Sequence, residues 1–160
     1  MTDIAVRADR YGRYDAALNR GDLVPDNTLR AAVLVCLFTD REATPEQLAA
    51  YGMDPSDTRG WWGDALNDDP NDRWGSHLWL LERQMVTPAL VPSAKTFAED
   101  ALAILVKIGA ASAVVASPFI DDEENLILPI AITKPDGSVE NYRFANLWAE
   151  ADVDPFEGIA

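Results

Sequence analysis

The stretch from Thr28 to Phe38 carries apolar residues at helical spacing and almost no charge. Arg30 is its only charged residue. The apolar positions that repeat with the helical period are Leu29, Ala32, Val33, Cys36 and Leu37, while Leu34, Val35 and Phe38 fill the other side. A helix that is apolar nearly all round belongs in the centre of a protein. We therefore predict a central helix here, capped at its N-terminus by Asp26 or Asn27.

A second long helix is predicted from about Ser93 to Ile108. Its expected buried stripe consists of Phe97, Ala101, Ile104, Leu105 and Ile108. Thr96 and Glu99 have the spacing of a capping box, and Gly109 follows the helix where a left-handed residue often ends one.

Between these two helices the chain is acidic and rich in turn residues from Thr39 to Arg73. Thr44 is expected to cap a short helix from Pro45 to Tyr51, because proline is favoured at the first helical position. Ser76 is expected to cap a further helix that runs through Arg83, with Leu78, Leu81 and Met85 on one side. A connection of this length is usually functional or disordered, and its tryptophans favour an ordered one.

Alternation with a period of two predicts strands at both ends of the chain. Tyr14 to Val24 has the pattern of a hairpin with its turn at Asn19 to Gly21. Three further strands are expected at Ala113 to Ser117, Asn125 to Thr133 and Val139 to Trp148, with a turn at Lys134 to Gly137. The fold class is therefore α+β: an N-terminal β-hairpin, three main helices and a C-terminal antiparallel three-stranded meander. We expect one domain over residues 1–160, with an ordered connection at 39–73 and an acidic C-terminal tail at 149–160.

Composition narrows the possible partners. The formal net charge is −14, which opposes binding to nucleic acid or to an anionic membrane surface, so neutral or basic proteins are the expected partners. No stretch reaches the roughly 20 apolar residues that cross a bilayer. The first thirteen residues are charged and lack the apolar core of a secretory signal, which predicts synthesis in the cytoplasm.

Catalytic and metal-binding chemistry finds little support in the sequence. Cys36 and His77 are the only cysteine and histidine, so a zinc site is not expected. Cofactor fingerprints are absent, and Asp121 to Glu124 lacks the ligand spacing of a calcium loop and is expected to be a solvated turn. Asp64 with Glu82, or the pair at positions 68 and 69, could serve as the two carboxylates of a glycosidase, provided they converge in one cleft.

Four of the five tryptophans lie in a short segment that is otherwise rich in Asp, Gly and Pro. Trp61 and Trp62 are adjacent within it and flanked by glycines. Two interpretations compete: the pair anchors the long connection to the chain's own core, or it forms an interface hot spot for another protein. A stacking platform for carbohydrate or nucleic acid is disfavoured because no basic groove accompanies it. Arg59 would reinforce either of the first two by pairing with Asp57 or Asp64.

Four blocks of the sequence, in this order, resemble a known family. They are the run from Leu29 to Arg41, the Arg-Gly-Trp-Trp-Gly-Asp block within Asp57 to Asp64, the block from Gly75 to Leu81, and the helical run from Ala98 to Val106. The family is that of the phage Mu-like contractile-tail baseplate wedge proteins, and the Trp-Trp block is its most specific part. The proline-containing stretch from Thr87 to Ser93 departs from the uninterrupted helix that the family pattern implies.

The resemblance implies a structural component of the virion tail baseplate, in a phage or a tailocin. Such a wedge protein would link neighbouring wedge subunits and the tail sheath, and it would repeat around a six-fold axis. Members of the wider group, which includes sheath-initiating wedge proteins of other contractile systems, join their neighbours by sharing strands. The resemblance therefore implies no catalytic role, and a peptidoglycan-cleaving glycosidase remains the alternative.

Two surfaces follow as candidate partner interfaces. The first is the Trp loop, with Arg59, Trp61, Trp62 and Asp64. The second is the last strand with the tail, Val139 to Ala160. Its Tyr142, Phe144 and Trp148 are expected to grip a partner strand, while the acidic tail would speed the encounter with a basic partner.

Overall fold

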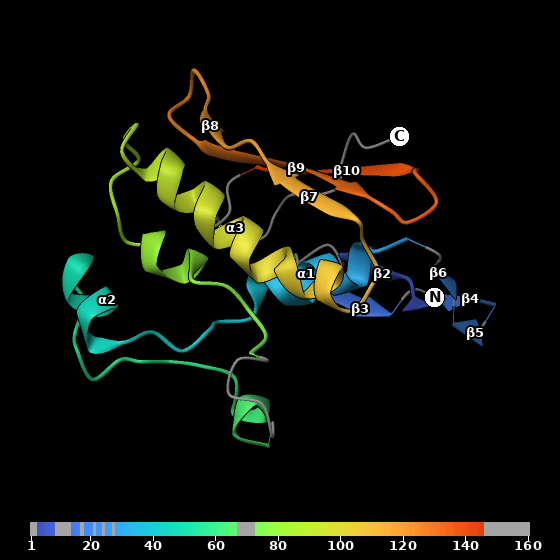
Figure 1. Ribbon diagram of the computed structural model, residues 1–160, viewed down its shortest axis with the longest axis horizontal. Helices are drawn as coiled ribbons and strands as arrows, with labels where there is room; N and C mark the ends of the chain where they lie inside the picture. Colours follow the sequence, from blue (N-terminus) through green and yellow to red (C-terminus); the bar gives the residue numbers. More distant parts are fainter. Residues whose placement is uncertain are drawn as a thin grey trace.

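A four-stranded antiparallel sheet with helices packed on one face forms the centre of the molecule (Figure 1). The computed structural model describes residues 3–8, 14–16, 18–20, 22–23, 25–26, 28–66 and 73–145. The helices are α1 (Arg30–Phe38), α2 (Pro45–Ala50) and α3 (Leu90–Lys107), with 3-10 helices η1 (Trp62–Leu66) and η2 (Leu78–Leu81). The strands of the sheet are β7 (Ala113–Ala116), β8 (Phe119–Ile120), β9 (Leu126–Thr133) and β10 (Val139–Phe144). The α+β class is confirmed.

The C-terminal meander is confirmed, with β9 in the middle. The order is β10-β9-β7, and the short β8, which the sequence pattern did not predict, pairs with the start of β9. Both long pairings are antiparallel, with Ile132 of β9 opposite Glu140 on one side and Val114 on the other. The predicted turn closes between Gly137 N–H and the Lys134 carbonyl at 2.9 Å. Because β9 has neighbours on both edges and a helix over one face, five of its apolar side chains are buried.

Helix α3 lies along one face of this sheet and begins three residues before the predicted start. Pro92 falls in its first turn, where the missing N–H costs no helical hydrogen bond, so the proline-containing stretch does not delay the helix. The buried positions are Leu90, Ala94, Ala98, Ala101, Leu102 and Leu105. Small alanines on this face let the helix approach the sheet closely.

Two details predicted for this helix are wrong. Thr96 is exposed inside the helix and is not its cap, and Glu99 instead accepts a hydrogen bond from Ala116 N–H of β7 at 3.0 Å. Ile108 is exposed, because the buried stripe runs through the alanines rather than through the larger residues at the helix end. Gly109 does end the helix, with φ +76°.

Helix α1 begins at Arg30, and its N-terminus is satisfied from a distant part of the chain. The Leu29 N–H donates to the Glu140 carboxylate of β10 at 2.9 Å, so the predicted capping by Asp26 or Asn27 is wrong. Val33, Cys36 and Leu37 are buried, whereas Val35 and Phe38 are exposed in the described residues. The helix is therefore buried on one side and not all round, because the sheet and α3 cover only that side.

Short antiparallel pairs precede α1: β1 (Asp3–Ile4) with β6 (Pro25–Asp26), β2 (Val6–Ala8) with β3 (Tyr14–Ala16), and β4 (Leu18–Asn19) with β5 (Asp22–Leu23). The predicted turn is confirmed, since Asn19 lies opposite Asp22. The first arm of the predicted hairpin is only partly right, because Tyr14–Ala16 pairs with Val6–Ala8 instead.

The connection from residue 39 to 73 carries the predicted short helix. Thr44 and Gln47 form a reciprocal capping box at the start of α2, and Pro45 occupies its first turn. The helix predicted from Ser76 to Arg83 is shorter, a single 3-10 segment, and Met85 is exposed. Leu48 of α2 and Leu80 of η2 pack with Ala43 and Trp79 in a second small core.

Candidate protein-interaction site

The Trp-containing connection is held to η2 by a short parallel bridge between Asp40 and Ser76. Arg41 N–H donates to the Ser76 carbonyl, and Ser76 N–H donates to the Thr39 carbonyl, each at 2.9 Å. Gly75 makes this approach possible: it has φ +98°, and a Cβ there would lie 2.4 Å from the Thr39 carbonyl oxygen. The bridge fixes the two ends of the connection relative to the core.

Trp79 of η2 is the buried anchor of this region. Its side chain is 4% exposed, and its indole N–H donates to the Arg41 carbonyl at 2.9 Å. The guanidinium of Arg59 lies 4.4 Å from the centre of the Trp79 ring, in a cation–π contact. Ala43 N–H also donates to the Thr58 carbonyl. The segment just before Trp61 is therefore held by two contacts, one with Ala43 and one with Trp79.

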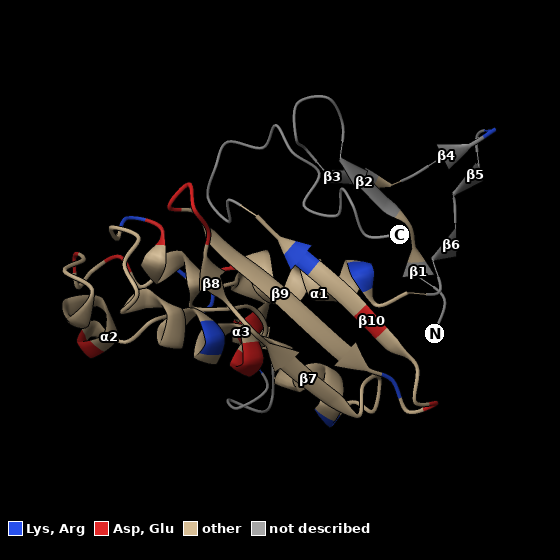
Figure 2. Cartoon of the chain, turned by 90° about the horizontal axis from the view of Figure 1, so that it is seen from above, with Lys and Arg blue, Asp and Glu red and all other residues tan. Residues whose placement is uncertain are grey.

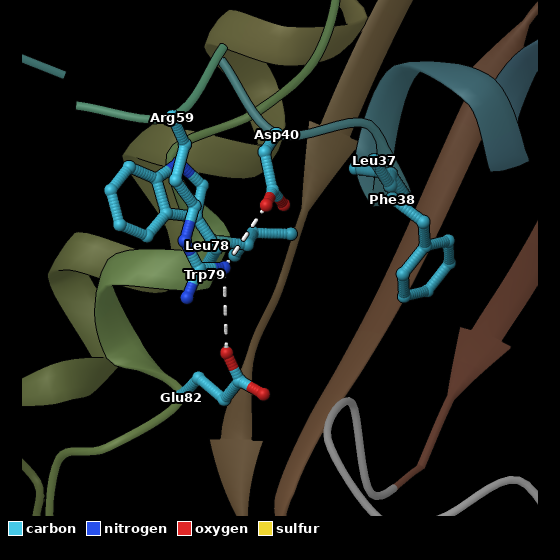
Figure 3. A pocket seen from close by; sticks show the side chains of 7 residues that line it. All are labelled: Leu37, Phe38, Asp40, Arg59, Leu78, Trp79 and Glu82. Atoms are coloured by element: carbon cyan, nitrogen blue, oxygen red, sulfur yellow. Dashed lines mark hydrogen bonds and ion pairs between the residues drawn. The ribbon is translucent and has the colours of Figure 1, made fainter. Parts of the chain in front are cut away.

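Three carboxylates lie around Arg59, and Figure 3 shows two of them, Asp40 and Glu82. Its Nη1 lies 3.0 Å from Asp40 and 3.8 Å from Glu82, and its Nε lies 3.8 Å from Asp57. The predicted pairing with Asp57 is therefore present, although the closest partner is Asp40. Arg59 adopts a left-handed backbone conformation with φ 49°, which turns the chain towards the tryptophan pair.

Trp61 and Trp62 are exposed, 40% and 74% respectively. Their rings are tilted by 49° with centroids 5.6 Å apart. Gly63 lets the Trp61 ring fold back over the chain, since a Cβ at that position would come within 2.3 Å of the ring. Burial of this pair in the chain's own core, one of the two sequence interpretations, is therefore wrong: Trp79 anchors the connection instead.

A pocket of about 320 Å³ opens beside this pair, and we call it the Trp pocket. Six of the residues that line it are Glu42, Arg59, Trp61, Trp62, Asp64 and Arg73. Arg73 forms an ion pair with Glu42. Asp64 accepts a hydrogen bond from Trp74 N–H at 3.3 Å through Oδ1, while its Oδ2 is buried and has no hydrogen-bond partner in the structure as described. The lining of the Trp pocket thus combines two aromatic side chains with two arginines and two carboxylates, and Asp64 Oδ2 itself is closed to solvent.

A second pocket, of about 200 Å³, lies between the end of α1 and η2. Leu37, Phe38 and Leu78 form its apolar lining, and Arg59 with Asp40 and Glu82 forms its polar lining (Figure 3). Arg59 therefore lines both pockets.

The second candidate interface was the last strand with the tail, and the structure buries two of the aromatic side chains that were expected to be free for a partner. Tyr142 and Phe144 of β10 are buried in the chain's own core, and Phe144 meets Phe38 edge-on at 5.4 Å. Tyr142 donates a hydrogen bond to Glu140, which also pairs with Lys134. These two aromatic side chains are thus already packed, which removes the reason for expecting them to grip a partner strand. Trp148 and the tail lie outside the described residues.

The proposed glycosidase pair is not brought into one cleft. Asp64 lines the Trp pocket, whereas Glu82 lines the second pocket, where it faces Arg59. The alternative pair at positions 68 and 69 lies outside the described residues. Asp121 accepts hydrogen bonds from Glu123 and Asn125 N–H groups in the β8–β9 turn, as expected for a solvated turn.

Cys36 and His77 are both packed against other parts of the chain, as residues with a structural role are. Burial raises the pKa of the Cys36 thiol to about 12. Burial also lowers the pKa of His77, whose Nε2 lies 3.0 Å from the Glu42 carbonyl oxygen and whose ring meets Phe97 edge-on. Within the described residues no cluster of three metal-ligating side chains occurs, and none of the described helices has the length and apolar character of a membrane span.

Sequence reasoning missed Trp79, Asp40 and Gly75, although they build the support under the Trp loop. Their roles depend on contacts between segments more than thirty residues apart, as in the Trp79 bond to the Arg41 carbonyl. Only the buried Trp79 had a local signal, a tryptophan within an apolar run.

Comparisons with known proteins identify the family of this chain. The family model described as phage protein GP46 matches residues 29–139, a range that includes the Trp loop, η2 and α3. The baseplate protein gp46 of Escherichia phage Mu is 41% identical over 144 residues, which cover 90% of this chain and 95% of that protein. The Mu-like prophage FluMu protein gp46 of Haemophilus influenzae is 33% identical over 149 residues, covering 93% of this chain and 99% of that protein. The chain therefore belongs to the GP46 family of Mu-like phage baseplate proteins.

Proposed function

We propose that this chain is a structural component of a contractile tail baseplate, in which it acts as a wedge protein that links neighbouring wedge subunits and the first tail sheath subunits. The observation that carries the proposal is the 41% identity with the Mu baseplate protein over 95% of that protein's length. Near-complete coverage matters here, because a shared function is more secure when the whole length of the relative is matched rather than one module.

The Trp loop supports a contact role within such an assembly. Exposed tryptophan and arginine residues dominate the binding energy of protein interfaces, and here they stand on a rigid base formed by Trp79 and the Asp40–Ser76 bridge. An aromatic pair that is 40% and 74% exposed gains free energy when a partner covers it. We propose Arg59, Trp61, Trp62 and Asp64 as the centre of this interface.

The last strand supports a second contact. In the described residues β10 pairs with β9 on one side only, and we propose that its other edge takes a strand from a neighbour. The residues after it, 149–160, are acidic and would attract a basic partner. Acidic residues also gather along the chain at the β8–β9 turn and around α2 (Figure 2), which favours neutral or basic neighbours in the six-fold arrangement that we propose.

The proposal predicts the consequence of deleting the gene for this chain from its phage. Tails should then lack an attached sheath and infectious particles should be absent, because sheath polymerisation has lost its starting surface. Electron microscopy of the lysate and plaque counts measure both, and supplying the intact chain from a plasmid is the control. Sheathed tails of normal length without this chain would contradict the proposal. Normal particles that bind cells but fail to cross the cell wall would instead favour the glycosidase.

A further inference from the structure

The face of the sheet that points away from the helices is open. Figure 1 shows the helices on one side of β7, β9 and β10, and Figure 2 looks onto the other side, where these strands lie in front of the helices. Side chains alternate along a strand, so the residues between the buried ones point to this open side. A pocket of about 270 Å³ lies there, which we call the sheet pocket, and its lining includes Val115 and Ser117 of β7, Pro129 and Ala131 of β9, and Asn141 and Arg143 of β10.

We propose that the sheet pocket receives an aspartate or glutamate side chain, together with an apolar side chain from the same segment of a neighbouring baseplate subunit. The carboxylate pairs with Arg143, and the apolar side chain lies on the floor that β7 and β9 form. This occupant belongs to the assembly that we propose for the chain, so the inference rests on the proposed function.

The first argument is the charge of Arg143. This residue is exposed near the end of β10, and it forms no ion pair with a carboxylate of the described residues. Asp121 of the β8–β9 turn is close enough to feel its charge but lies beyond ion-pair distance. No other residue that lines the sheet pocket is charged, so an entering carboxylate meets a cation and no acid. A guanidinium binds a carboxylate through two parallel N–H groups, and the amide of Asn141 on the same side of β10 offers further donors.

The second argument is the apolar floor. A sheet face that meets water usually carries polar side chains, yet Val115 is 50% exposed here and lies opposite Ala131. Pro129 is unusual in a strand with neighbours on both edges, because it has no N–H. Ser117 N–H donates to the Pro129 carbonyl at 3.0 Å, and the proline cannot return the bond. The sheet thus loses one hydrogen bond and presents a rigid apolar ring, whose covering by an apolar side chain is favourable.

The third argument is that size and charge favour a protein segment over other occupants. The volume of about 270 Å³ is below the roughly 300 to 1,000 Å³ of pockets that enclose whole small molecules. Nucleic acid and anionic membranes need clustered lysine and arginine, and the lining holds a single cation. A second copy of this chain is disfavoured, because it brings a further net charge of −14 and a symmetric contact sets arginine against arginine. The neighbour is therefore neutral or basic overall, with its carboxylate on the contacting segment.

The first test removes the charge of the sheet pocket. Arg143→Gln keeps most of the side-chain length, and Arg83→Gln is the matched control, because Arg83 is exposed after η2 and does not line this pocket. Both purified variants should keep the circular dichroism spectrum and the urea midpoint of the parent protein. In complemented particles Arg143→Gln should lower the infectious yield by at least about tenfold, whereas the control should stay within about twofold. Equal yields for the two variants would overturn the inference.

Arg143→Lys separates the carboxylate pairing from a general effect of the substitution. Lysine keeps the positive charge but loses the forked geometry, so this variant should lose less infectious yield than Arg143→Gln. A lysine variant that is as defective as the glutamine variant would show that the positive charge is not what the position supplies. Main-chain pairing along the free edge of β10 is the same in all three proteins, because only the side chain changes.

The second test identifies the occupant. Val139 is 53% exposed on the same open face and lies outside the lining, so it is replaced by the photoreactive benzoyl-phenylalanine. Assembled particles are irradiated, and the cross-linked peptide is sequenced by mass spectrometry. The expected peptide comes from another baseplate subunit and contains an aspartate or glutamate. Exchanging the charges, with Arg143→Glu in this chain and that acid replaced by arginine, should restore at least about a tenth of the normal yield, while each single reversal abolishes it.

The outcomes separate this inference from the proposed function. A cross-link to residues 146–160 of the same chain, no cross-link to another subunit, or a charge exchange that restores nothing overturns the assignment of the sheet pocket. In each of these cases the baseplate role stands as long as deletion of the gene still abolishes sheathed tails. Sheathed tails of normal length after the deletion overturn the proposed function itself.

Discussion

Replacing Gly75 with alanine should destabilise the protein by about 4 kcal/mol, the largest effect on stability expected from a change of one methyl group. Two causes act together. The residue has φ +98°, which disfavours any side chain, and the new Cβ would lie 2.4 Å from a backbone oxygen of Thr39 that cannot move without breaking the Asp40–Ser76 bridge. Urea unfolding followed by tryptophan fluorescence measures the loss, which corresponds to a fall in melting temperature of about 10 °C.

Gly109→Ala is the matched control for this prediction. It also introduces a Cβ at positive φ, +76°, but nothing lies within 4 Å of that position. Only the conformational cost remains, so we expect a loss of about 1 to 2 kcal/mol. The difference between the two variants isolates the crowding at the bridge. Equal losses would show that the close approach of Gly75 to Thr39 is not important for stability.

Replacing Trp61 and Trp62 together with alanine should abolish assembly while leaving the fold intact. Both rings are exposed, so the free energy of unfolding should fall by less than about 1 kcal/mol. At an interface each such ring contributes on the order of 2 kcal/mol or more, so the double variant should bind its neighbour at least about a thousandfold more weakly. Unfolding curves and the yield of infectious particles measure the two effects separately.

Trp79→Ala is the comparison for that double variant, because the same residue type is buried there. It should lower the stability by about 3 to 5 kcal/mol and release Arg59 from its stacking partner. A double Trp61 and Trp62 variant that loses as much stability as Trp79→Ala would show that the exposed pair supports the fold. Unchanged stability together with an unchanged particle yield would remove the pair from both roles.

Elements with a local signal could be predicted from the sequence. The Thr44 cap of α2, the end of α3 at Gly109 and the turn from Lys134 to Gly137 each depend on a few neighbouring residues. The three strands of the meander followed from alternation and composition for the same reason. These preferences operate over a turn or two of chain, and nothing distant opposes them here.

Features set by distant contacts could not be predicted. The N–H of Leu29, the residue before α1, donates to the carboxylate of Glu140, which is 111 residues away. Glu99 looked like part of a local capping box but binds the backbone of β7 instead. In both cases a side chain satisfies an N–H that only the tertiary fold brings near, so sequence spacing carries no trace of it.

Some features of the candidate site could likewise be predicted from the sequence, and others could not. The residue types of the Trp loop, and the pairing of Arg59 with Asp57, were accessible from the sequence. The sequence could not show whether Trp61 and Trp62 are buried, because a tryptophan in a glycine-flanked loop suits a core and an interface equally well. In the structure Trp79 occupies the small second core, and Trp61 and Trp62 remain at the surface.

The most direct measurement of the central claim is an electron cryo-microscopy map of the assembled tail that contains this chain. We expect its density in the baseplate, repeated around the six-fold axis, with another subunit covering Trp62, whose side chain is 74% exposed in the free protein. A map that places the chain outside the baseplate, or in which the rings of Trp61 and Trp62 face solvent in the complete particle, would contradict the account.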